Sequence, residues 1–441
     1  MIVNSITDYN TLIQKCDTEV GIVVFVPAST STHPSINKIS FVYYYFDTGE
    51  SYILGVTHTD TLVKYDIVLP KIGYVVNKKE ATHLFGDAVK LKDIYSLWYT
   101  AGKPLPDISK HYDIWTNNFF QTFSDFKVLN KTIRINNIIP LSNWYTVLNN
   151  FCKELMEDMP LETSAFAFFD TVVIPSLASI ERNGLYVNST KFEASFPDKI
   201  HNVHKDLVHT NYNPFTLTSR PSNAYKGINY AALNKSDGSR EVFESRFGSS
   251  GVLLQLDFDA YHLRLLANAM GMKLPSNSLH EVLANEYFGT SELTSEQYEE
   301  GKKMTFQFLY GNVTPTDDMP VLLRNIHKHI TTITKEYKSH RRLQTLSGRL
   351  ITEIDGGLHK VFNYYVQSLE AETTYKMLHT LMENLKGIQS KATLYTYDSV
   401  LFDVEISELE IVKEIIYKSI DTATFPITLS MGNNYDNLLD I

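Results

Sequence analysis

Two aspartates stand where an apolar, strand-like stretch gives way to a helical pattern. The segment LLQLDFDAYHLRLLANAM, residues 253–270, carries Asp257 and Asp259 at this junction. Either carboxylate could cap the helix, because the first helical turn leaves backbone N–H groups free and its dipole favours negative charge. Either could instead ligate a hard cation such as Mg²⁺, which prefers oxygen ligands. The segment alone leaves both interpretations open.

A further carboxylate, Asp398, interrupts the stretch TLYTYDSVLFDVE, residues 393–405. Apolar residues alternate on both sides of Asp398-Ser399, which predicts a tight β-hairpin with Asp398 at its tip. Aspartate is common in turns, so a structural role alone would explain this position. Two carboxylates from distant segments can also share two Mg²⁺ ions about 3.5–4 Å apart, which stabilise the attacking and leaving oxygens of a phosphoryl transfer.

A lysine and two aromatic residues are spaced to form one stripe along a helix. In EEGKKMTFQFLYGN, residues 299–312, Lys302, Phe306 and Tyr310 follow one another at intervals of four. An apolar stripe that packs against a core would explain the two rings, but not a lysine that continues it. A cation followed by two rings suits a nucleotide, with its triphosphate at the lysine and its base beyond.

The composition describes a folded, acidic protein. The chain has 441 residues, 43% of them hydrophobic and 12% aromatic, with a formal net charge of −10. This length allows two or three domains. Its two cysteines exclude a disulfide framework or a CxxC metal site and favour a reducing compartment. We see no signal peptide and no apolar run of the ~18 residues that a membrane span needs, so we expect a soluble, cytoplasmic protein without a membrane partner.

Positive charge is concentrated in one segment of this acidic chain. Between Val321 and Leu350 the only acidic residue is Glu336, among seven basic residues and three histidines. A solvated helix surface would normally mix both signs, so we favour a phosphate-binding face. The basic residues are Arg324, Lys328, Lys335, Lys338, Arg341, Arg342 and Arg349.

The hydrophobic patterns predict an α+β chain. Short apolar runs between turns over residues 21–76 indicate a β-meander, and a helical pattern follows over residues 77–126. An α+β N-terminal domain would thus cover residues 1–130, followed by a connecting segment over 131–164. The remainder, 165–441, reads as one large α+β unit with helices at 164–183, 294–309, 321–340 and 365–385.

The three motifs, in this order, resemble those of the family A DNA polymerases, the group of bacterial DNA polymerase I and the phage replicases. LDFDAYHLR is similar to motif A, usually D-Y-S-x-x-E-L-R, and aligns Asp257 with the metal-binding aspartate. KKMTFQFLYG resembles motif B, K-x-x-x-F-x-x-x-Y-G, through Lys302, Phe306 and Tyr310. YTYDSVLFDV resembles motif C, usually V-H-D-E-x-x-x-E, through Asp398. The resemblance covers about residues 165–441.

Flanking segments extend the resemblance. TSRPS aligns Arg220 and Ser222 with the family's T-G-R-x-S, and SLHEVL aligns His280 with the triphosphate contact of D-I-H. TLSGRL and NYYVQ resemble the family's template-side motifs. The resulting DNA-binding predictions are Arg220, Ser222, Arg349, Asn363, Gln367 and, from the basic segment, Arg341 and Arg342.

The resemblance implies a right-hand polymerase fold: a palm with an antiparallel sheet, fingers over about 271–345, a thumb stub over 188–207 and motif C at 393–405. It implies two Mg²⁺ ions held by Asp257, Asp398 and the Phe258 carbonyl, with Lys302 also catalytic. Asp259 stands where the family has a serine, so we expect it to cap the helix. The implied nucleotide-binding residues are Lys302, Phe306, Tyr310, His262, His280 and Lys303.

Further positions in and near the motifs depart from the family. His262 replaces the glutamate that excludes ribonucleotides, which leaves sugar discrimination open. Tyr298 replaces a fingers arginine, whose task Lys303 could take over. Ser399 replaces the second motif C carboxylate, and Asp-Ser also occurs in single-subunit phage RNA polymerases. RNA synthesis is therefore an alternative to DNA synthesis, as is a catalytically silent DNA-binding relative.

Two family elements are reduced. The exonuclease motif F-D-x-E reads Phe25-Val26-Pro27-Ala28 here, N-x-x-x-D reads Asn77-Lys78-Lys79-Glu80-Ala81, and Tyr-x-x-x-Asp is missing after Pro106. We therefore predict an RNase H-like, exonuclease-like domain without its metal ligands, although an unrelated α+β domain is an alternative.

Only about 20 residues stand where the family has a helical thumb. We expect a DNA polymerase that binds primer-template DNA and dNTPs, does not proofread and needs a partner subunit for processivity. The compact design and a composition that suggests an AT-rich genome would suit a bacteriophage replicase in its host's cytoplasm.

Overall fold

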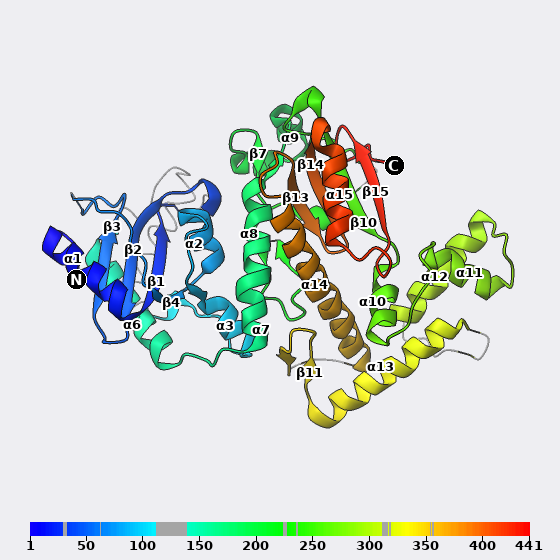
Figure 1. Cartoon of the computed structure of the whole chain (residues 1–441), viewed down its shortest axis with the longest axis horizontal. Helices are drawn as coiled ribbons and strands as arrows, with labels where there is room; N and C mark the ends of the chain where they lie inside the picture. Colours follow the sequence, from blue (N-terminus) through cyan, green and yellow to red (C-terminus); the bar gives the residue numbers. More distant parts are fainter. Residues whose placement is uncertain are drawn as a thin grey trace. The chain divides into compact units, whose positions relative to one another are not determined.

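The computed structural model describes residues 1–29, 33–61, 63–111, 139–223, 227–234, 237–310, 316, 319–352, 354 and 357–441. The chain divides into two compact units, Met1–Ala178 (unit 1) and Ser179–Ile441 (unit 2) (Figure 1). The boundary lies within helix α8, Ile174–Asn183. The domain limits expected near residues 130 and 165 stay predictions. Residues 112–138, which include part of the expected helical pattern and of the region searched for Tyr-x-x-x-Asp, lie outside the described part.

Unit 1 is built on a five-stranded sheet with the order β3-β2-β1-β4-β5. Strands β1, β2 and β3 pair antiparallel, but β4 pairs parallel to β1, and β5 parallel to β4. The expected meander is therefore wrong for its last strand: the chain after β3 returns to the other edge of β1, and apolar alternation does not encode strand direction. The strands are β1 Val20–Pro27, β2 Ile39–Phe46, β3 Ser51–Gly55, β4 Ile72–Val75 and β5 Lys92–Asp93.

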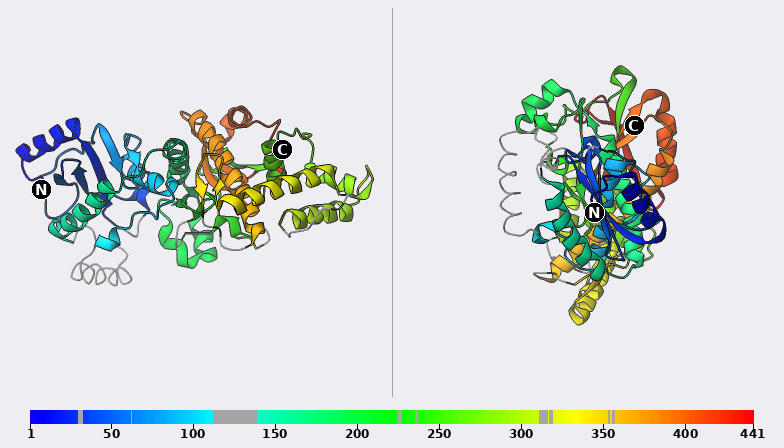
Figure 2. Two further views of the ribbon diagram at one scale, coloured as in Figure 1. Left: turned by 90° about the horizontal axis from the view of Figure 1, so that it is seen from below. Right: turned by 90° about the vertical axis from the view of Figure 1, so that its left-hand side faces the viewer.

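The sheet of unit 1 has a hydrophobic core on each face. Phe41 and Tyr43 of β2 belong to the core that includes α3 and α6, whereas Val42 and Tyr44 belong to the core that includes α1. This alternation follows from the two-residue period of a strand and explains why every residue of β2 is buried. Figure 2 shows α1 and α6 on opposite sides of the sheet. The helices are α1 Ile6–Thr18, α2 Lys78–Phe85, α3 Ile94–Thr100, α6 Leu141–Glu157 and α7 Ser164–Phe168.

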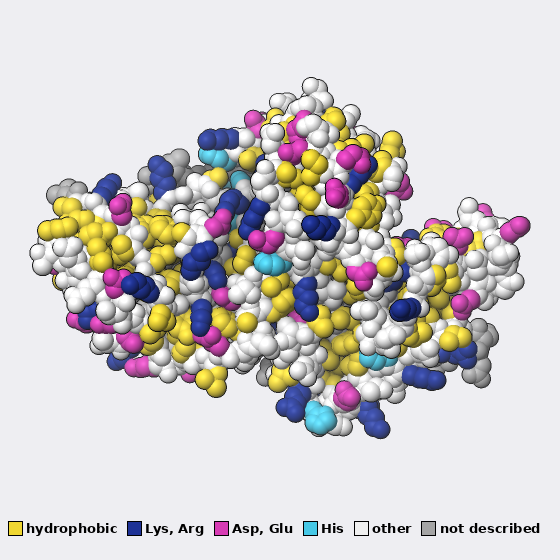
Figure 3. Space-filling model, in the orientation of Figure 1, with side chains coloured by type: hydrophobic (Ala, Val, Ile, Leu, Met, Phe, Trp, Pro, Cys, Tyr) yellow, Lys and Arg dark blue, Asp and Glu magenta, His cyan; other side chains and the backbone are white. Residues whose placement is uncertain are grey.

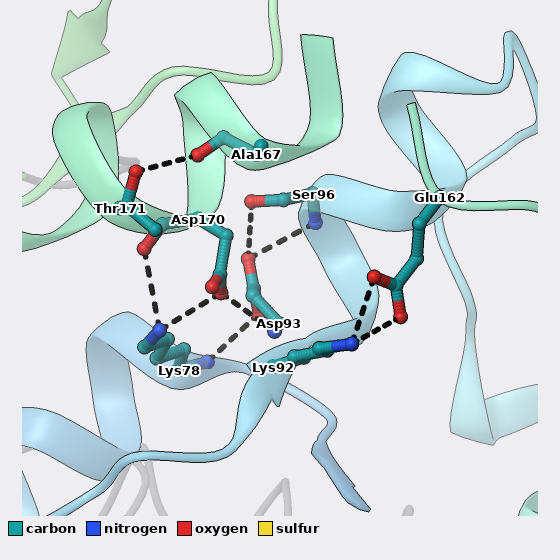
Figure 4. A network of polar contacts seen from close by, with 8 residues as sticks. All are labelled: Lys78, Lys92, Asp93, Ser96, Glu162, Ala167, Asp170 and Thr171. Carbon is teal, nitrogen blue, oxygen red and sulfur yellow. Dashed lines mark hydrogen bonds and ion pairs between the residues drawn. The ribbon is translucent and has the colours of Figure 1, made fainter. Parts of the chain in front are cut away.

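A buried polar network holds three helical segments of unit 1 together (Figure 4). The Asp93 carboxylate accepts from the backbone N–H groups of Lys78 and Ser96, at 2.9 and 3.0 Å. The Asp93 N–H donates to Asp170, whose carboxylate also lies 2.9 Å from the Lys78 Nζ. Asp170 lies in a π-helical turn, Phe169–Val173, between α7 and α8. Burial raises the pKa of Asp93 to about 6.

Unit 2 contains a five-stranded sheet with the order β13-β14-β10-β15-β16, and every neighbouring pair is antiparallel. The expected antiparallel sheet is thus confirmed, with β10 as its middle strand. The strands are β10 Gly251–Phe258, β13 Lys391–Thr396, β14 Ser399–Glu405, β15 Ile427–Gly432 and β16 Leu439–Asp440. Among its described residues, unit 2 also has three short antiparallel strand pairs: β6 Leu185–Tyr186 with β7 Leu207–Val208, β8 Tyr212–Asn213 with β9 Ser222–Asn223, and β11 Leu343–Gln344 with β12 Leu350–Ile351.

Of the helices expected in unit 2, those at 294–309 and 321–340 agree with α12 and α13 to within one residue, whereas the one expected at 365–385, α14, begins seven residues earlier, at Leu358. Helices α11 and α12 pack so closely that a Cβ on Gly301 would lie 2.7 Å from the Cβ of Ala284, which explains the glycine inside EEGKK. The segment expected as a thumb stub forms the short helix α9, Ser189–Ser195, and a 3₁₀ turn, Pro197–Asn202. The other helices are α10 Tyr261–Ala269, α11 Leu279–Phe288, α12 Ser295–Tyr310, α13 Val321–His340, α14 Leu358–Asn384 and α15 Leu409–Ser419.

One helical stretch, Ser164–Asn183, is long and apolar enough to cross a membrane by length and composition. Of its most apolar window, 61% is buried inside the protein, as is common for a core helix.

Candidate active site

A cleft of about 640 Å³ opens in unit 2 beside the end of β10. It gathers side chains from β10, α10, α11, α12, α14 and the β13–β14 turn, which are far apart in the sequence. Nine residues that the sequence predicted to be functional line it: Arg220, Asp257, Phe258, His262, His280, Lys302, Phe306, Tyr310 and Asp398.

The backbone of the sheet brings Asp257 and Asp398 together. On β10, Asp257 lies opposite Ser399 of β14 and opposite Thr428 of β15. The N–H of Phe258 donates to the Asp398 carbonyl oxygen at 3.1 Å. The expected hairpin is present: Tyr397 and Asp398 form the turn between β13 and β14, and Tyr397 has a φ of 62°. Asp257, near the end of β10, and Asp398, in the turn next to it, therefore both line the cleft.

The two carboxylates have different surroundings. Burial raises the pKa of Asp398, and nearby Glu370 raises it further, whereas Arg220 and His262 act in the opposite direction. Asp257 accepts a hydrogen bond from the Gln255 side chain at 3.2 Å. A cation bound in the cleft would favour the ionised form of both carboxylates.

Helix α12 presents a cation and two rings to this cleft. Phe306 and Tyr310 stack nearly parallel, with ring centroids 6.3 Å apart, and each is 42% exposed. The His280 ring lies 5.6 Å from that of Phe306, and burial lowers the pKa of His280. Lys302 and Tyr298 also line the cleft, whereas Lys303 does not and is exposed. The three residues of the predicted stripe, Lys302, Phe306 and Tyr310, therefore all line the cleft.

The expectation that Asp259 caps the following helix is wrong. The N-cap of α10 is Ala260, a residue in the left-handed conformation with no side-chain cap. Asp259 instead forms an ion pair with Arg264 at 2.7 Å and accepts from the Leu279 N–H at 3.3 Å. Because Arg264 is 2% exposed, its buried charge needs this carboxylate. Asp259 therefore links α10 to the start of α11.

A carboxylate that sequence reasoning missed lies at the back of the cleft. Glu370, on α14, is 1% exposed and contacts both Arg220 and His262. The signal was weak, because a glutamate in the segment NYYVQSLEAE looks like an ordinary surface residue until the helix is placed. Other cleft-lining residues that the sequence did not indicate include Arg240, Gln255, Tyr435 and Asp440.

The residues predicted to contact DNA are spread over several elements. Arg349 is 4% exposed, and its guanidinium donates to the Leu217 carbonyl oxygen at 2.7 Å and to Ser219 at 3.1 Å. Asn363 and Gln367 are half-buried, one turn apart on α14, and Ser222 is exposed on β9.

Helix α13 carries most of the basic segment. Lys and Arg side chains gather along it on the face shown in Figure 3. Arg341 and Arg342 follow the helix and are exposed, and the Arg341 guanidinium lies 5.4 Å from the Tyr337 ring. Four of the seven basic residues thus lie on one helix, while Arg341, Arg342 and Arg349 follow it in the chain.

The positions that would carry exonuclease carboxylates in unit 1 are apolar and buried. Val26 and Ala28 lie at the end of β1, and Ala81 lies on α2. Their exposed fractions are 5%, 1% and 1%, respectively. None of these three residues offers a metal ligand from its side chain.

Comparison with known proteins finds similarity both in sequence and in fold, while no protein-family model matches the chain. In sequence, the chain is similar to the DNA polymerase of Bacillus phage SP01, with 22% identity over 255 residues. That match covers 46% of this chain and only 28% of the phage protein. In fold, the chain is similar to the POL domain of Pol1 from M. smegmatis, solved in complex with DNA primer-template and dNTP. The TM-score is 0.69, with 12% identity and 99% of each chain covered.

The structural similarity extends over both units and shows that the chain has the fold of a DNA polymerase I polymerase domain. The sequence similarity independently points to a phage DNA polymerase. Together with the three ordered motifs, these findings support a family A DNA polymerase.

Proposed function

We propose that the chain is a template-directed DNA polymerase that adds dNTPs to a primer 3′ end by two-metal phosphoryl transfer. The observation that carries this proposal is the convergence of Asp257 and Asp398 in one cleft that Lys302 also lines. A chain that only binds nucleic acid would have no use for two carboxylates and a lysine in such a cleft.

The cleft offers a donor set that suits Mg²⁺. The side chains of Asp257 and Asp398 and the carbonyl of Phe258 would supply oxygen ligands, from the end of β10 and from the β13–β14 turn. When bound, the ions would stabilise the charge that develops during phosphoryl transfer. The β10–β14 pairing keeps Asp257 opposite Ser399 and thus next to the turn that carries Asp398.

The nucleotide would lie along α12. Lys302 and His280 would contact its triphosphate, while Phe306 and Tyr310 would pack against its base and sugar. The partial exposure of both rings in the free protein supports this role, because it leaves apolar faces open in a cleft. Burial lowers the pKa of His280 in the free protein, whereas a bound triphosphate would favour its charged form.

Primer-template DNA would lie against Arg220, Ser222, Asn363 and Gln367, with the exposed basic surface of α13 near its phosphates. Arg349 would act indirectly, by holding the Leu217–Ser219 loop through its two hydrogen bonds. The short α9 and its 3₁₀ turn leave little to grip a duplex. We therefore propose that a protein partner binds this chain and supplies processivity, an exonuclease or a thumb. We also propose that the protein acts in the cytoplasm of a phage-infected host.

Within this proposal, the domain limits are residues 1–130 for an exonuclease-like domain, 131–164 for a connection and 165–441 for the polymerase. The first domain would lack proofreading activity, and buried Val26, Ala28 and Ala81 support this view.

Primer extension with purified protein tests the proposal. We expect the wild type to extend a primer with dNTPs and Mg²⁺. Asp257→Ala and Asp398→Ala should each lower the rate by about 1,000-fold or more, because metal-borne charge stabilisation contributes several kcal/mol. Glu410→Ala is a matched control, since this carboxylate on α15 has an 83% exposed side chain. Extension at the wild-type rate by both aspartate variants would show that the activity is not that of this cleft and would refute the assignment.

A second candidate is RNA synthesis, which the Asp398-Ser399 pair favours. Parallel reactions with rNTPs separate the two, because an RNA polymerase would prefer rNTPs. A catalytically silent relative would extend no primer with either substrate.

A further inference from the structure

Ser219 has a rare backbone conformation immediately before Arg220. Its φ is 63°, in the left-handed region that residues other than glycine seldom adopt. Its side chain is fully buried. In the family pattern T-G-R-x-S, the residue at this position is a glycine, which adopts a positive φ without a steric penalty. A serine with this φ must be held in place by its surroundings.

Neighbours from three segments hold Ser219. Arg349, just before β12, donates from Nη2 to the Ser219 Oγ at 3.1 Å. The Tyr375 hydroxyl, on α14, donates to the Ser219 carbonyl oxygen at 2.9 Å. The Ser219 N–H donates to the Thr216 carbonyl oxygen at 3.1 Å. The hydroxyl, the carbonyl and the N–H of Ser219 are therefore all hydrogen-bonded.

A buried carboxylate, Glu372, holds the turn that carries Arg349. It accepts from the Ser347 N–H at 2.6 Å and from the Ser347 hydroxyl at 3.2 Å. Ser347 lies in the turn between β11 and β12, where the Arg349 carbonyl oxygen also accepts from the Thr345 N–H at 2.8 Å. Since Glu372 and Tyr375 are three residues apart on α14, the helix holds Ser219 both directly and through this turn.

The conformation of Ser219 determines the direction in which Arg220 leaves the backbone. Pro221, on the other side of Arg220, restricts the residue before it to an extended backbone. The Arg220 carbonyl oxygen accepts from the Thr216 hydroxyl at 2.7 Å. With the backbone fixed on both sides, the Arg220 guanidinium lines the cleft, with its Cζ 4.0 Å from the centre of the Tyr397 ring. A different φ at Ser219 would turn this side chain away from the ring.

On this basis, which rests on the proposed function, we propose that Ser219 is a positioning residue for DNA binding. Its left-handed backbone places the Arg220 guanidinium where primer-template DNA contacts it. Arg349 and Tyr375 offset the cost of this conformation, and Glu372 keeps Arg349 in place. Substitutions at Ser219 should therefore rank by how readily each residue adopts a positive φ.

The affinity for primer-template DNA without dNTPs, measured by fluorescence anisotropy, tests this ranking. Arg220→Ala should raise Kd by about 10-fold or more, the effect of losing a charged hydrogen-bond donor. Ser219→Val should raise it about equally, because a β-branched residue resists a positive φ. Ser219→Gly should stay within about 3-fold of the wild type, and Ser219→Ala should fall between the two. Binding by Ser219→Gly as weak as that by Ser219→Val would overturn the proposal.

Two further variants separate positioning from general damage. Ser219→Val combined with Arg220→Ala should bind about as weakly as Arg220→Ala alone, since Ser219 acts through Arg220. Losses that multiply would overturn the proposal. Asp206 also has a positive φ, 59°, but is exposed and does not line the cleft. Asp206→Val is therefore a matched control and should change Kd by less than about 2-fold. A loss equal to that of Ser219→Val would show that backbone strain anywhere in unit 2 is responsible, and would likewise overturn the proposal.

A spectroscopic measurement tests the inference without DNA or catalysis. In protein labelled with ¹⁵N-arginine, with the Arg220 Nε–H signal assigned from an Arg220→Lys spectrum, the Tyr397 ring should shift this signal away from that of free arginine. Ser219→Val should remove the shift, and Ser219→Gly should retain it. An Arg220 signal that is unchanged in folded Ser219→Val would contradict the inference. A chain that extends no primer refutes the proposed function, whereas the arginine signal reports on Ser219 in either case.

Discussion

Lys302 and Lys303 are neighbours on α12, but only Lys302 lines the cleft, whereas Lys303 is exposed outside it. We therefore predict that Lys302→Met lowers kcat/KM for dNTPs by about 10- to 100-fold, the effect of losing a contact between charged groups. Lys303→Met, a substitution of the same size and charge, should change it by no more than about 2-fold. Steady-state primer extension measures both. Equal losses would mean that Lys303 takes over the task of the arginine that Tyr298 replaces.

The buried apolar residues at the exonuclease-like positions predict the absence of 3′–5′ exonuclease activity. Wild-type protein incubated with a labelled primer and Mg²⁺, without dNTPs or pyrophosphate, should leave the 3′ end intact. Asp257→Ala should behave identically in this assay. Progressive shortening of the primer by both proteins would contradict the prediction and would point to a metal site elsewhere in the chain.

The short α9 and its 3₁₀ turn predict low processivity. With a heparin trap added at the start of the reaction, the isolated chain should release its primer after short extensions, because few elements can enclose the duplex. The length distribution on a denaturing gel is the measurement. Products of kilobases under the trap would show that other surfaces retain the DNA without a partner.

The pair of Asp259 and Arg264 should be critical for the stability of unit 2. The Arg264 guanidinium also donates to the carbonyl oxygens of Pro275 and Asn277, at 2.8 and 2.9 Å. Arg264→Leu would leave these acceptors and the carboxylate without their donor, at a cost of about 3–5 kcal/mol in the free energy of unfolding. Denaturant unfolding monitored by circular dichroism measures this loss. Lys273→Leu removes a nearby positive charge as a control and should change stability by less than about 1 kcal/mol.

Asp93 predicts a pH dependence for unit 1. Burial raises the pKa of Asp93 from 3.8 to about 6 in the folded protein. A group with a raised folded pKa stabilises the protein fully below its unfolded pKa and loses this contribution as the pH rises through its folded pKa. The free energy of unfolding should therefore increase as the pH falls from about 6 to 3.8, relative to Asp93→Asn. Parallel slopes for wild type and variant would contradict the prediction.

The local features of the site could be predicted from the sequence. The hairpin at Asp398 follows from strand alternation around a turn, and the stripe of Lys302, Phe306 and Tyr310 follows from helical spacing. Both features depend on residues that are close together in the chain, so the local pattern of residue types is sufficient to predict them. The alignment of motif A with β10 likewise anticipated that Asp257 ends a strand.

The features that the sequence did not predict depend on contacts between distant segments. Glu370 reaches His262 from 108 positions away, and nothing near either residue indicates the pairing. Asp259 looked like a cap because it precedes a helix, but the buried Arg264 competes for its carboxylate. The direction of β4 depends on the path of the connection after β3, which apolar alternation does not encode.

Because β10 is the middle strand of its sheet, it should tolerate insertions and deletions less well than the segment expected as a thumb stub. A single-residue deletion within β10 would turn Asp257 to the opposite face of the sheet and break its register with both β14 and β15 at once. The 3₁₀ turn Pro197–Asn202 is not a strand of this sheet, so an insertion there would not shift the pairing of β10. A DNA-enclosing module could therefore be inserted there to lengthen the products while the sheet keeps the carboxylates in place.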